Sequence, residues 1–182
     1  MELLVQLTWR VEASPHESDH VQYQCEAALK STQISYKNAV LHHPEYDILR
    51  PIIRIALPSM AIPKHDRPER DEHIIVLTMS MLRNLVEIGA RNFEATGIDR
   101  EKNEHSRSET VSSLEKSDVF NLIVALAAGT TDEYEKIDCL LLEIIYHLLK
   151  GVNVNDILAG TAEIRAVRSI TSTLTFRNRS MI

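Results

Sequence analysis

Histidine is the residue type that first suggests metal chemistry in this 182-residue sequence, because eight histidines are present. His16 and His20 stand one helical turn apart with Asp19 beside them, and His42 is followed directly by His43. A zinc site requires three or four ligands that converge on one point and are oriented by further hydrogen bonds. The spacing does not predict such a set, so we interpret these histidines as solvated residues on helix surfaces and expect no metal or other cofactor.

One pair of side chains has the spacing of an acid–base couple. Glu143 and His147 are four residues apart, which places them on one side of a helix, and an ordinary stabilising pair is the simpler interpretation. The sequence contains no phosphate-binding glycine loop and no HExxH, CxxC or GxSxG motif. We therefore expect no catalytic residues and no enzymatic activity.

Two groups of basic residues could contact a partner protein or DNA. The first lies in a proline-rich connector and consists of Lys64, Arg67 and Arg70. Acidic residues alternate with these three, which favours local salt bridges and leaves a phosphate-binding strip as the alternative. The second group lies in residues 164–182, which contain no acidic residue and four arginines: Arg165, Arg168, Arg177 and Arg179.

The charge of the remaining chain opposes strong binding to nucleic acid. The whole sequence has a net charge of −6, and residues 111–163 carry nine acidic but only three basic residues. Affinity for phosphate groups comes from clustered positive charge. A solvated acidic surface with a basic tail is therefore the simplest interpretation, and we expect at most weak binding to duplex DNA.

Residues 71–90 form the helix around which the other elements are predicted to pack. Ten of its residues are large and apolar, and Ser80, Arg83, Asn84 and Glu87 form one narrow polar stripe at about 100° per residue. A helix that is apolar on nearly all sides is buried between neighbours. We expect Arg83 and Asn84 to hydrogen-bond the backbone of an adjacent helix rather than a ligand.

Helical patterns cover most of the remaining sequence, over residues 2–9, 14–41, 46–57, 106–116, 118–128 and 134–150. Capping boxes at residues 14–17, 106–109 and 130–133 are predicted to start three of these helices, and Ser117 to start a fourth. The last helix repeats the design of the central one. The helix over residues 14–41 is predicted to bury a face that contains Val21, Cys25, Ala28 or Leu29, Tyr36 and Val40.

Two connectors are predicted to be irregular. Residues 57–71 are rich in proline, and residues 91–107 are charged and lack large aliphatic side chains. Pro51 is expected to kink the helix over residues 46–57 or to mark a fresh start. Cys25 and Cys139 are predicted to be buried thiols, because each lies in a helical pattern and the two are far apart in sequence.

The fold class predicted from these patterns is all-α. Helices covered on more than one side and joined by short connectors favour an armadillo- or HEAT-like α-solenoid of stacked antiparallel helices, with a compact bundle as the alternative. We expect one helical domain over residues 1–152, followed by a divergent basic tail over residues 153–182. No run reaches 18 apolar residues, so no membrane span is predicted.

Several segments resemble the N-terminal region of the Timeless family, in its fungal branch of topoisomerase-associated replication fork factors. The resemblance lies in residues 36–89 and 119–152. Its strongest points are the connector ALPSMAIP, the helix that begins at RDE, the helix end EIIYHLLKG and the segment LTWRVE near the start. Together these segments cover about residues 2–152.

The resemblance implies a non-enzymatic nuclear scaffold in the replication fork protection complex. It implies roles in fork stabilisation and pausing, in S-phase checkpoint signalling and in genome stability. The implied partners are a Tipin-type small subunit, a Claspin-type checkpoint mediator, the replicative helicase and duplex DNA. The family fold is a helical-repeat solenoid, which agrees with the independent prediction. A generic helical-repeat adaptor unrelated to replication is the alternative function.

The sequence departs from the family pattern near both ends. Arg10 stands where the family is expected to have proline, and after Gly151 the chain turns to a segment unlike the family. Family members are several times longer, so the sequence suggests a shortened form. We expect Leu3, Leu4, Val5 and Leu7 to be left uncovered and to promote self-association, unless residues 171–182 fold over them.

Overall fold

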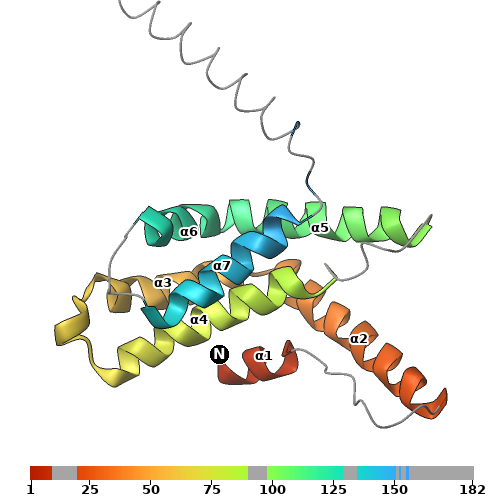
Figure 1. Cartoon of the computed structure of the whole chain (residues 1–182), viewed down its shortest axis with the longest axis horizontal. Helices are drawn as coiled ribbons and strands as arrows, with labels where there is room; N and C mark the ends of the chain where they lie inside the picture. The colour runs from red at the N-terminus through yellow and green to blue at the C-terminus, as the bar shows by residue number, and fades with distance from the viewer. Residues whose placement is uncertain (10–19, 90–97, 129–134, 151, 153–154, 156–182) are drawn as a thin grey trace, which may run out of the picture. The chain divides into compact units, whose positions relative to one another are not determined.

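The computed structural model of the chain describes residues 1–9, 20–89, 98–128, 135–150, 152 and 155. These residues form seven α-helices and one 3-10 helix, with no strand among them. The elements are α1 (Glu2–Leu7), α2 (His20–Leu41), α3 (Leu49–Ala61), η1 (Lys64–Asp66), α4 (Glu69–Glu87), α5 (Ile98–Lys116), α6 (Val119–Ala128) and α7 (Glu135–Leu149) (Figure 1). The all-α prediction is confirmed, whereas the repetition of helix pairs into a solenoid stays a prediction.

Helix α4 is the central element, as predicted. It contacts α1, α3 and α5 (Figure 1), and every residue from Thr78 to Glu87 except Arg83 is buried. Ser80, Asn84 and Glu87 of the predicted polar stripe are therefore buried as well. The stripe faces other helices rather than water, so its side chains need partners inside the protein.

Local chemistry sets both ends of α4. Pro68 precedes the helix, and three acidic residues in the first turn complement the positive end of the helix dipole: Glu69, Asp71 and Glu72. At the other end, Gly89 has φ +84°, a left-handed conformation that glycine adopts without steric cost. The uninterrupted run of non-glycine, non-proline residues between these signals gives the long helix.

Helices α3 and α4 form an antiparallel pair joined by a connector that is more regular than predicted. Because α3 begins at Leu49, Pro51 lies in its first turn, where the missing N–H has no helical partner to lose. The helix continues through Pro58, and η1 follows it, so the prediction of an irregular connector is wrong for both segments. The buried face holds α3 together here, with Ile53, Ala56 and Ser59 turned inward.

The buried face of α2 is not the predicted one. Of the residues predicted for this face, Val40 is buried, whereas four are exposed: Cys25, Ala28, Leu29 and Tyr36. The side chain of the remaining residue, Val21, lies outside those that the structure describes. The buried face instead contains Gln33, Lys37 and Val40. Gln33 and Lys37 are buried because each donates a hydrogen bond to a backbone carbonyl group. A hydrophobic pattern does not reveal a buried face that is held by polar side chains.

Helix α5 begins earlier than predicted. Residues 98–107 belong to it, so the predicted loop over residues 91–107 is wrong there, and residues 90–97 lie outside the described residues. Ser106 lies within the helix and does not start it: its carbonyl accepts a hydrogen bond from Thr110 Oγ1 at 2.7 Å. Glu, Lys and Arg are good helix formers, so a charged segment with few apolar residues can still be helical.

Helices α5 and α6 are separated by Ser117 and Asp118. Asp118 has φ 62°, in the left-handed region. The Ser117 hydroxyl donates to the carboxylate of Asp47, with oxygen distances of 3.2 and 3.3 Å. Ser117 therefore ties this junction to the start of α3 and does not serve as the predicted cap of α6.

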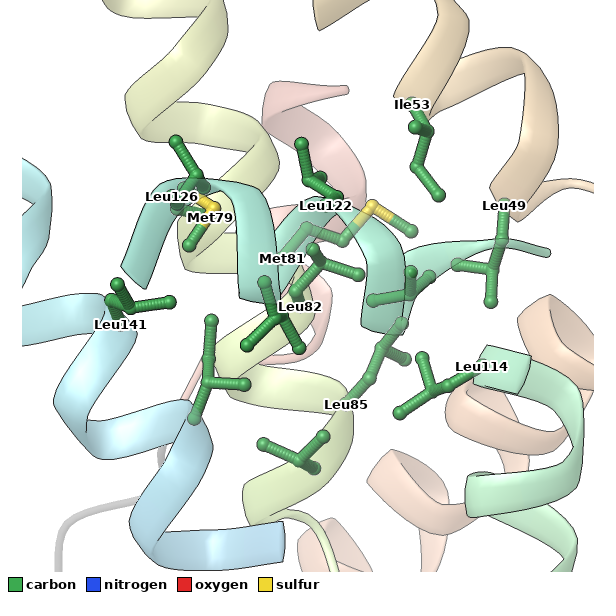
Figure 2. Packing of buried hydrophobic residues seen from close by; sticks show 14 of the residues in the cluster. Leu49, Ile53, Met79, Met81, Leu82, Leu85, Leu114, Leu122, Leu126 and Leu141 are labelled. Carbon is green, nitrogen blue, oxygen red and sulfur yellow. The ribbon is translucent and has the colours of Figure 1, made fainter. Parts of the chain in front are cut away.

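One hydrophobic cluster joins these helices. Side chains from α3, α4, α5, α6 and α7 converge on it (Figure 2): Leu49, Ile53, Met79, Met81, Leu82, Leu85, Leu114, Leu122, Leu126 and Leu141. Helix α1 adds Val5, whereas Leu3 and Leu7 of α1 are exposed. The expectation that the apolar residues of α1 lack cover is thus correct for Leu3 and Leu7. It is wrong for Val5 and for Leu4, which is partly buried against the cluster.

Helix α7 packs on the cluster by one side. Ile137, Leu141 and Ile144 are buried, whereas Leu142 and Tyr146 are exposed. Among the described residues, α7 therefore does not repeat the all-round burial of the central helix on the side of Leu142 and Tyr146. Cys25 and Cys139 are also exposed, which corrects the prediction of buried thiols.

Some predictions lie outside the described residues. They include the capping boxes at residues 14–17 and 130–133 and the arginines of the C-terminal segment. Beyond Leu148 the structure describes a separate short unit, in which the Val152 N–H donates to Leu149 O at 3.0 Å. None of the described helices is long and apolar enough to cross a membrane.

Candidate interaction surface

The predicted basic group at the α3–α4 connection divides into structural and exposed residues. Arg67 is half-buried; its Nε donates to Ser59 O at 3.2 Å and its Nη2 to Ile62 O at 2.7 Å. These carbonyl groups lie at the C-terminal end of α3, where a cation is favourable. Arg67 therefore closes α3, whereas Lys64 and Arg70 are exposed to solvent.

A second contact locks the same connection. The Ser59 hydroxyl of α3 donates to Asp71 Oδ1 in the first turn of α4, at 2.6 Å. A short charge-assisted bond of this kind between two helix ends fixes their relative orientation. A neighbouring ion pair joins His65 and Asp66, whose exposed side chains approach to 3.1 Å, and it involves none of the three basic residues for which salt bridges were predicted. Such exposed pairs contribute little to stability.

An open surface depression lies beside this connection, between α1 and the first half of α4. Its volume is about 520 Å³, and its lining consists of Glu2, Glu69, Arg70, His73, Ile74 and Leu77. Two half-buried aliphatic residues, Ile74 and Leu77, line it together with charged groups of both signs. Small-molecule sites usually enclose most of their ligand. An open, mixed depression is better suited to side chains of a partner protein.

Asn84, in the polar stripe of α4, binds the end of α1 and holds this short helix beside the depression. Asn84 Nδ2 donates to Val5 O at 3.1 Å and to Thr8 Oγ1 at 3.2 Å. The amide of Gln33, on α2, donates to Trp9 O. Side chains from two other helices therefore satisfy carbonyl groups at the end of the short helix α1, which could not be stable alone.

Arg83 connects the same junction to α7. Its Nη1 lies 3.0 Å from Glu87 Oε2, and its Nε lies 3.3 Å from Glu143 Oε2. The guanidinium carbon also lies 5.0 Å from the centre of the Trp9 ring, a cation–π contact. The prediction of a backbone contact is confirmed for Asn84, whereas Arg83 is held by two carboxylates and an aromatic ring.

Lys37 forms a third junction, which sequence reasoning missed. This residue of α2 is 3% exposed, and its Nζ donates to Ile88 O at 2.7 Å, at the end of α4. Burial lowers the pKa of Lys37 from 10.5 to about 8, and the carboxylate of Glu109 offsets part of that shift. Glu109 also lies 4.0 Å from His42 and 3.2 Å from His105. The only signal in the sequence was that the helical pattern of α2 is weakly amphipathic, so its apolar residues could not all be buried on one side.

The structure places part of the histidines and arginines that were considered as candidate site residues. His42 is exposed at the end of α2, and the described residues contain no cluster of ligands suited to a metal ion. Arg165, Arg168, Arg177 and Arg179 lie outside the described residues. The structure thus brings Arg67 and Arg70 to one connection, with Lys64 beside them, and contact of either basic group with a partner or DNA stays a prediction.

Comparison with protein families gives a match to the family described as Timeless protein, over residues 1–178. The chain belongs to the Timeless family. Topoisomerase 1-associated factor 1 of Aspergillus oryzae is 38% identical over 167 residues, which make up 90% of this chain and 14% of that protein. The same-named protein of Coccidioides immitis is 35% identical over 161 residues, which make up 86% of this chain and 13% of that relative. The resemblance found in the sequence motifs is confirmed.

A third Timeless-family relative gives the same extent of similarity. Topoisomerase 1-associated factor 1 of Neosartorya fischeri is 37% identical over 169 residues, or 93% of this chain. The chain spans about 14% of the length of this relative and of the Aspergillus oryzae protein. The similarity therefore concerns one helical part of much longer proteins.

Proposed function

We propose that this Timeless-family chain is a non-enzymatic, nuclear scaffold subunit of the replication fork protection complex. In this role it supports fork stabilisation and pausing, S-phase checkpoint signalling and genome stability. Membership of the family over residues 1–178 is the observation that carries the proposal. The partners we propose are a Tipin-type small subunit, a Claspin-type mediator and the replicative helicase, together with the topoisomerase 1 association in the relatives' name.

The described helices support a role in binding proteins. Helix ends at three junctions are closed by polar contacts, which are buried for Asn84 and Lys37 and partly buried for Arg67. Helices fixed in this way present a constant outer surface, and preorganised surfaces lose less entropy on binding. The depression between α1 and α4 and the exposed residues Lys64 and Arg70 are the proposed contacts on that surface.

Affinity purification tests the scaffold proposal. The tagged 182-residue chain would be purified from replicating cells and its partners quantified by mass spectrometry. We expect replisome proteins to be enriched, and we expect the double variant Lys64→Glu, Arg70→Glu to reduce that enrichment. Arg54→Glu is the matched control, because Arg54 is exposed on α3 outside the proposed surface. Enrichment of unrelated proteins in place of replisome components would support the generic adaptor instead.

Weak binding to duplex DNA is a separate part of the proposal. The C-terminal segment carries Arg165, Arg168, Arg177 and Arg179 without any acidic residue, on a chain with net charge −6. Deletion of residues 164–182 should therefore remove most of the binding measured at low salt, where phosphate contacts dominate. Unchanged affinity after the deletion would assign binding to the helical part, where Lys64 and Arg70 would be tested next.

A further inference from the structure

The depression lies where one side of α4 is left uncovered by α1. Thr78 Oγ1 of α4 lies 3.4 Å from Met1 Sδ, and Asn84 Nδ2 donates to Val5 O at 3.1 Å. Because the earlier residue of α4 contacts the start of α1 and the later residue its middle, α1 runs parallel to α4. It lies beside the second half of α4 (Figure 1). The depression is the unfilled continuation of this contact along the first half of α4.

The lining of the depression belongs to the same side of α4 as the contact with α1. Arg70, Leu77 and Asn84 are spaced by seven residues, close to two full turns, so they share one side of the helix. The uncovered part, from Arg70 to Leu77, is about 10 Å long, which is the length of two helical turns. A short helix in line with α1 would therefore fill it.

Four ionisable side chains line the depression, and none of them has an ion-pair partner among the described residues: Glu2, Glu69, Arg70 and His73. Arg70 and His73 stand about one turn apart at the start of α4. Glu2 lies at the other end, because it follows Met1, which contacts Thr78. The depression thus has positive charge at one end and negative charge at the other.

Glu69 disturbs this order only at the edge. At about 100° per residue, Arg70 is turned by about 20° from Leu77 around the helix axis, whereas Glu69 is turned by about 80°. Arg70 therefore shares the direction of the apolar lining, and Glu69 lies to one side of it. A segment in the depression would meet the arginine first.

These positions define the chemistry of a segment that fits. An acidic side chain over the first turn of α4 would pair with Arg70 and His73, and a basic side chain at the other end would pair with Glu2. Aliphatic residues between the two charges would cover Ile74 and Leu77. A helix is stabilised by acidic residues at its start and basic residues at its end. A helix with that charge order fits the depression parallel to α4.

We propose that the depression binds a two-turn amphipathic helix of a partner protein, with an acidic residue in its first turn and a basic residue in its last. Aliphatic side chains on its inner side contact α4, and the helix lies in line with α1. This inference rests on the proposed function, in which the depression is a partner contact. It adds the chemistry and the direction of the partner segment.

Fluorescence anisotropy with a labelled, hydrocarbon-stapled helical peptide tests this inference. The peptide has a glutamate in its first turn, two leucines on one side and a lysine in its last turn, and the staple reduces the entropy lost on ordering. We expect saturable binding to the 182-residue chain. Arg70→Glu should raise the Kd about tenfold, because repulsion replaces attraction. Arg54→Glu is the matched control, since Arg54 is exposed on α3 and does not line the depression.

A second peptide, with the glutamate and the lysine exchanged, tests the direction. It should bind the unmodified chain about tenfold more weakly than the first peptide. The double variant Glu2→Lys, Arg70→Glu should reverse this preference, which non-specific apolar association cannot do. Equal affinity of the two peptides for both proteins would overturn the proposal, as would the absence of binding or an unchanged Kd in Arg70→Glu.

Circular dichroism separates loss of binding from loss of the fold. Glu2 and Arg70 are exposed, so their variants should keep the helical content of the unmodified chain. If Arg70→Glu lost helical content, Arg70→Gln would replace it, and an unchanged Kd for the first peptide would then overturn the proposal.

The peptide experiment also fails separately from the replication proposal. Peptide binding with the expected charge preference, but without enrichment of replisome proteins, would support the depression as a helix-binding site and contradict the replication role. Replisome enrichment without any peptide binding would retain that role and overturn the helix-binding inference.

Discussion

Helices α4 and α7 have similar sequences but different surroundings. Both are rich in leucine and isoleucine, and both carry one polar stripe. In α4 the neighbours cover even the polar stripe, so that Ser80, Asn84 and Glu87 are buried. In α7 the neighbours cover one side, and Leu142 remains 67% exposed.

The difference shows what an apolar pattern determines. It determines which sides of a helix can be buried, because each buried aliphatic side chain contributes a favourable transfer free energy. It does not determine whether another helix is present to cover each side. In α4 the cover comes from α1, α3 and α5, which the chain itself supplies.

The largest effect expected from this difference concerns the inner residues of both helices. Leu82 of α4 is 1% exposed and Leu141 of α7 is 7% exposed. Leu82→Ala and Leu141→Ala should each lower the free energy of unfolding by about 2–5 kcal/mol, because each leaves a cavity in the cluster. Urea denaturation at a concentration where the chain is monomeric measures the effect. Losses below about 0.5 kcal/mol at both positions would contradict the burial described for the cluster.

The second effect concerns Lys37, which closes the end of α4. The pKa of this residue is about 8 in the folded chain, against 10.5 for an exposed lysine. Between these two values the unfolded chain binds more protons than the folded one, so stability should rise with pH over this interval. The gain is about 3 kcal/mol if Lys37 acts alone.

Lys37→Met provides the control for this pH dependence. Other groups also titrate between pH 8 and pH 10.5, so the quantity to measure is the difference in unfolding free energy between the unmodified chain and the variant. That difference should shift in favour of the unmodified chain as the pH rises, because methionine does not titrate. A difference that is independent of pH would mean that Lys37 is solvated in the folded chain.

A third and smaller effect separates the polar stripes of the two helices. Asn84→Ala should cost about 1–3 kcal/mol, because Val5 O and Thr8 Oγ1 lose a buried donor. Glu143→Ala should cost less than about 1 kcal/mol, because the Glu143 side chain is 53% exposed. Thermal unfolding of the two variants side by side measures the contrast. Equal losses of stability in the two variants would mean that the polar stripes of α4 and α7 are equally important for the fold.

The smallest effect is expected on the exposed side of α7, at Leu142. Leu142→Ala should change the stability of the monomer by less than about 0.5 kcal/mol, since the side chain is mostly exposed before the change. Unfolding should be followed at a concentration where the chain is monomeric, so that loss of association does not contribute. A loss comparable to that of Leu141→Ala would show that Leu142 is covered within one chain.

Most helices could be predicted from the sequence because their apolar spacing is strong. The central helix, α6 and α7 were predicted within a few residues of their ends. The start of α5 was missed because its first half has almost no apolar residues, and α3 was ended too early because Pro58 was interpreted as a terminator. In α3 the buried face outweighs the local signal of Pro58, whereas the start of α5 is helical because its charged residues are good helix formers.

The contacts that hold the helices together were harder to predict. Asn84 could be assigned a backbone partner, because a buried amide must be satisfied. Gln33 and Lys37 could not, because their acceptors, Trp9 O and Ile88 O, are brought close only by the fold. Every residue has a backbone carbonyl group, so the sequence does not show which carbonyl at a helix end will accept a hydrogen bond from a distant side chain.

The short break between α5 and α6 sets the rotational phase of the second helix. If the two helices were one continuous helix, their buried sides would lie about 180° apart at about 100° per residue. These sides are formed in α5 by Thr110, Ser113 and Leu114, and in α6 by Val119, Leu122, Ile123 and Leu126. The two non-helical residues, with Asp118 at φ 62°, therefore supply half a rotation. Inserting one residue into α6 just after this break would turn the rest of that helix by about 100° and move Leu122 and Leu126 out of register with the core.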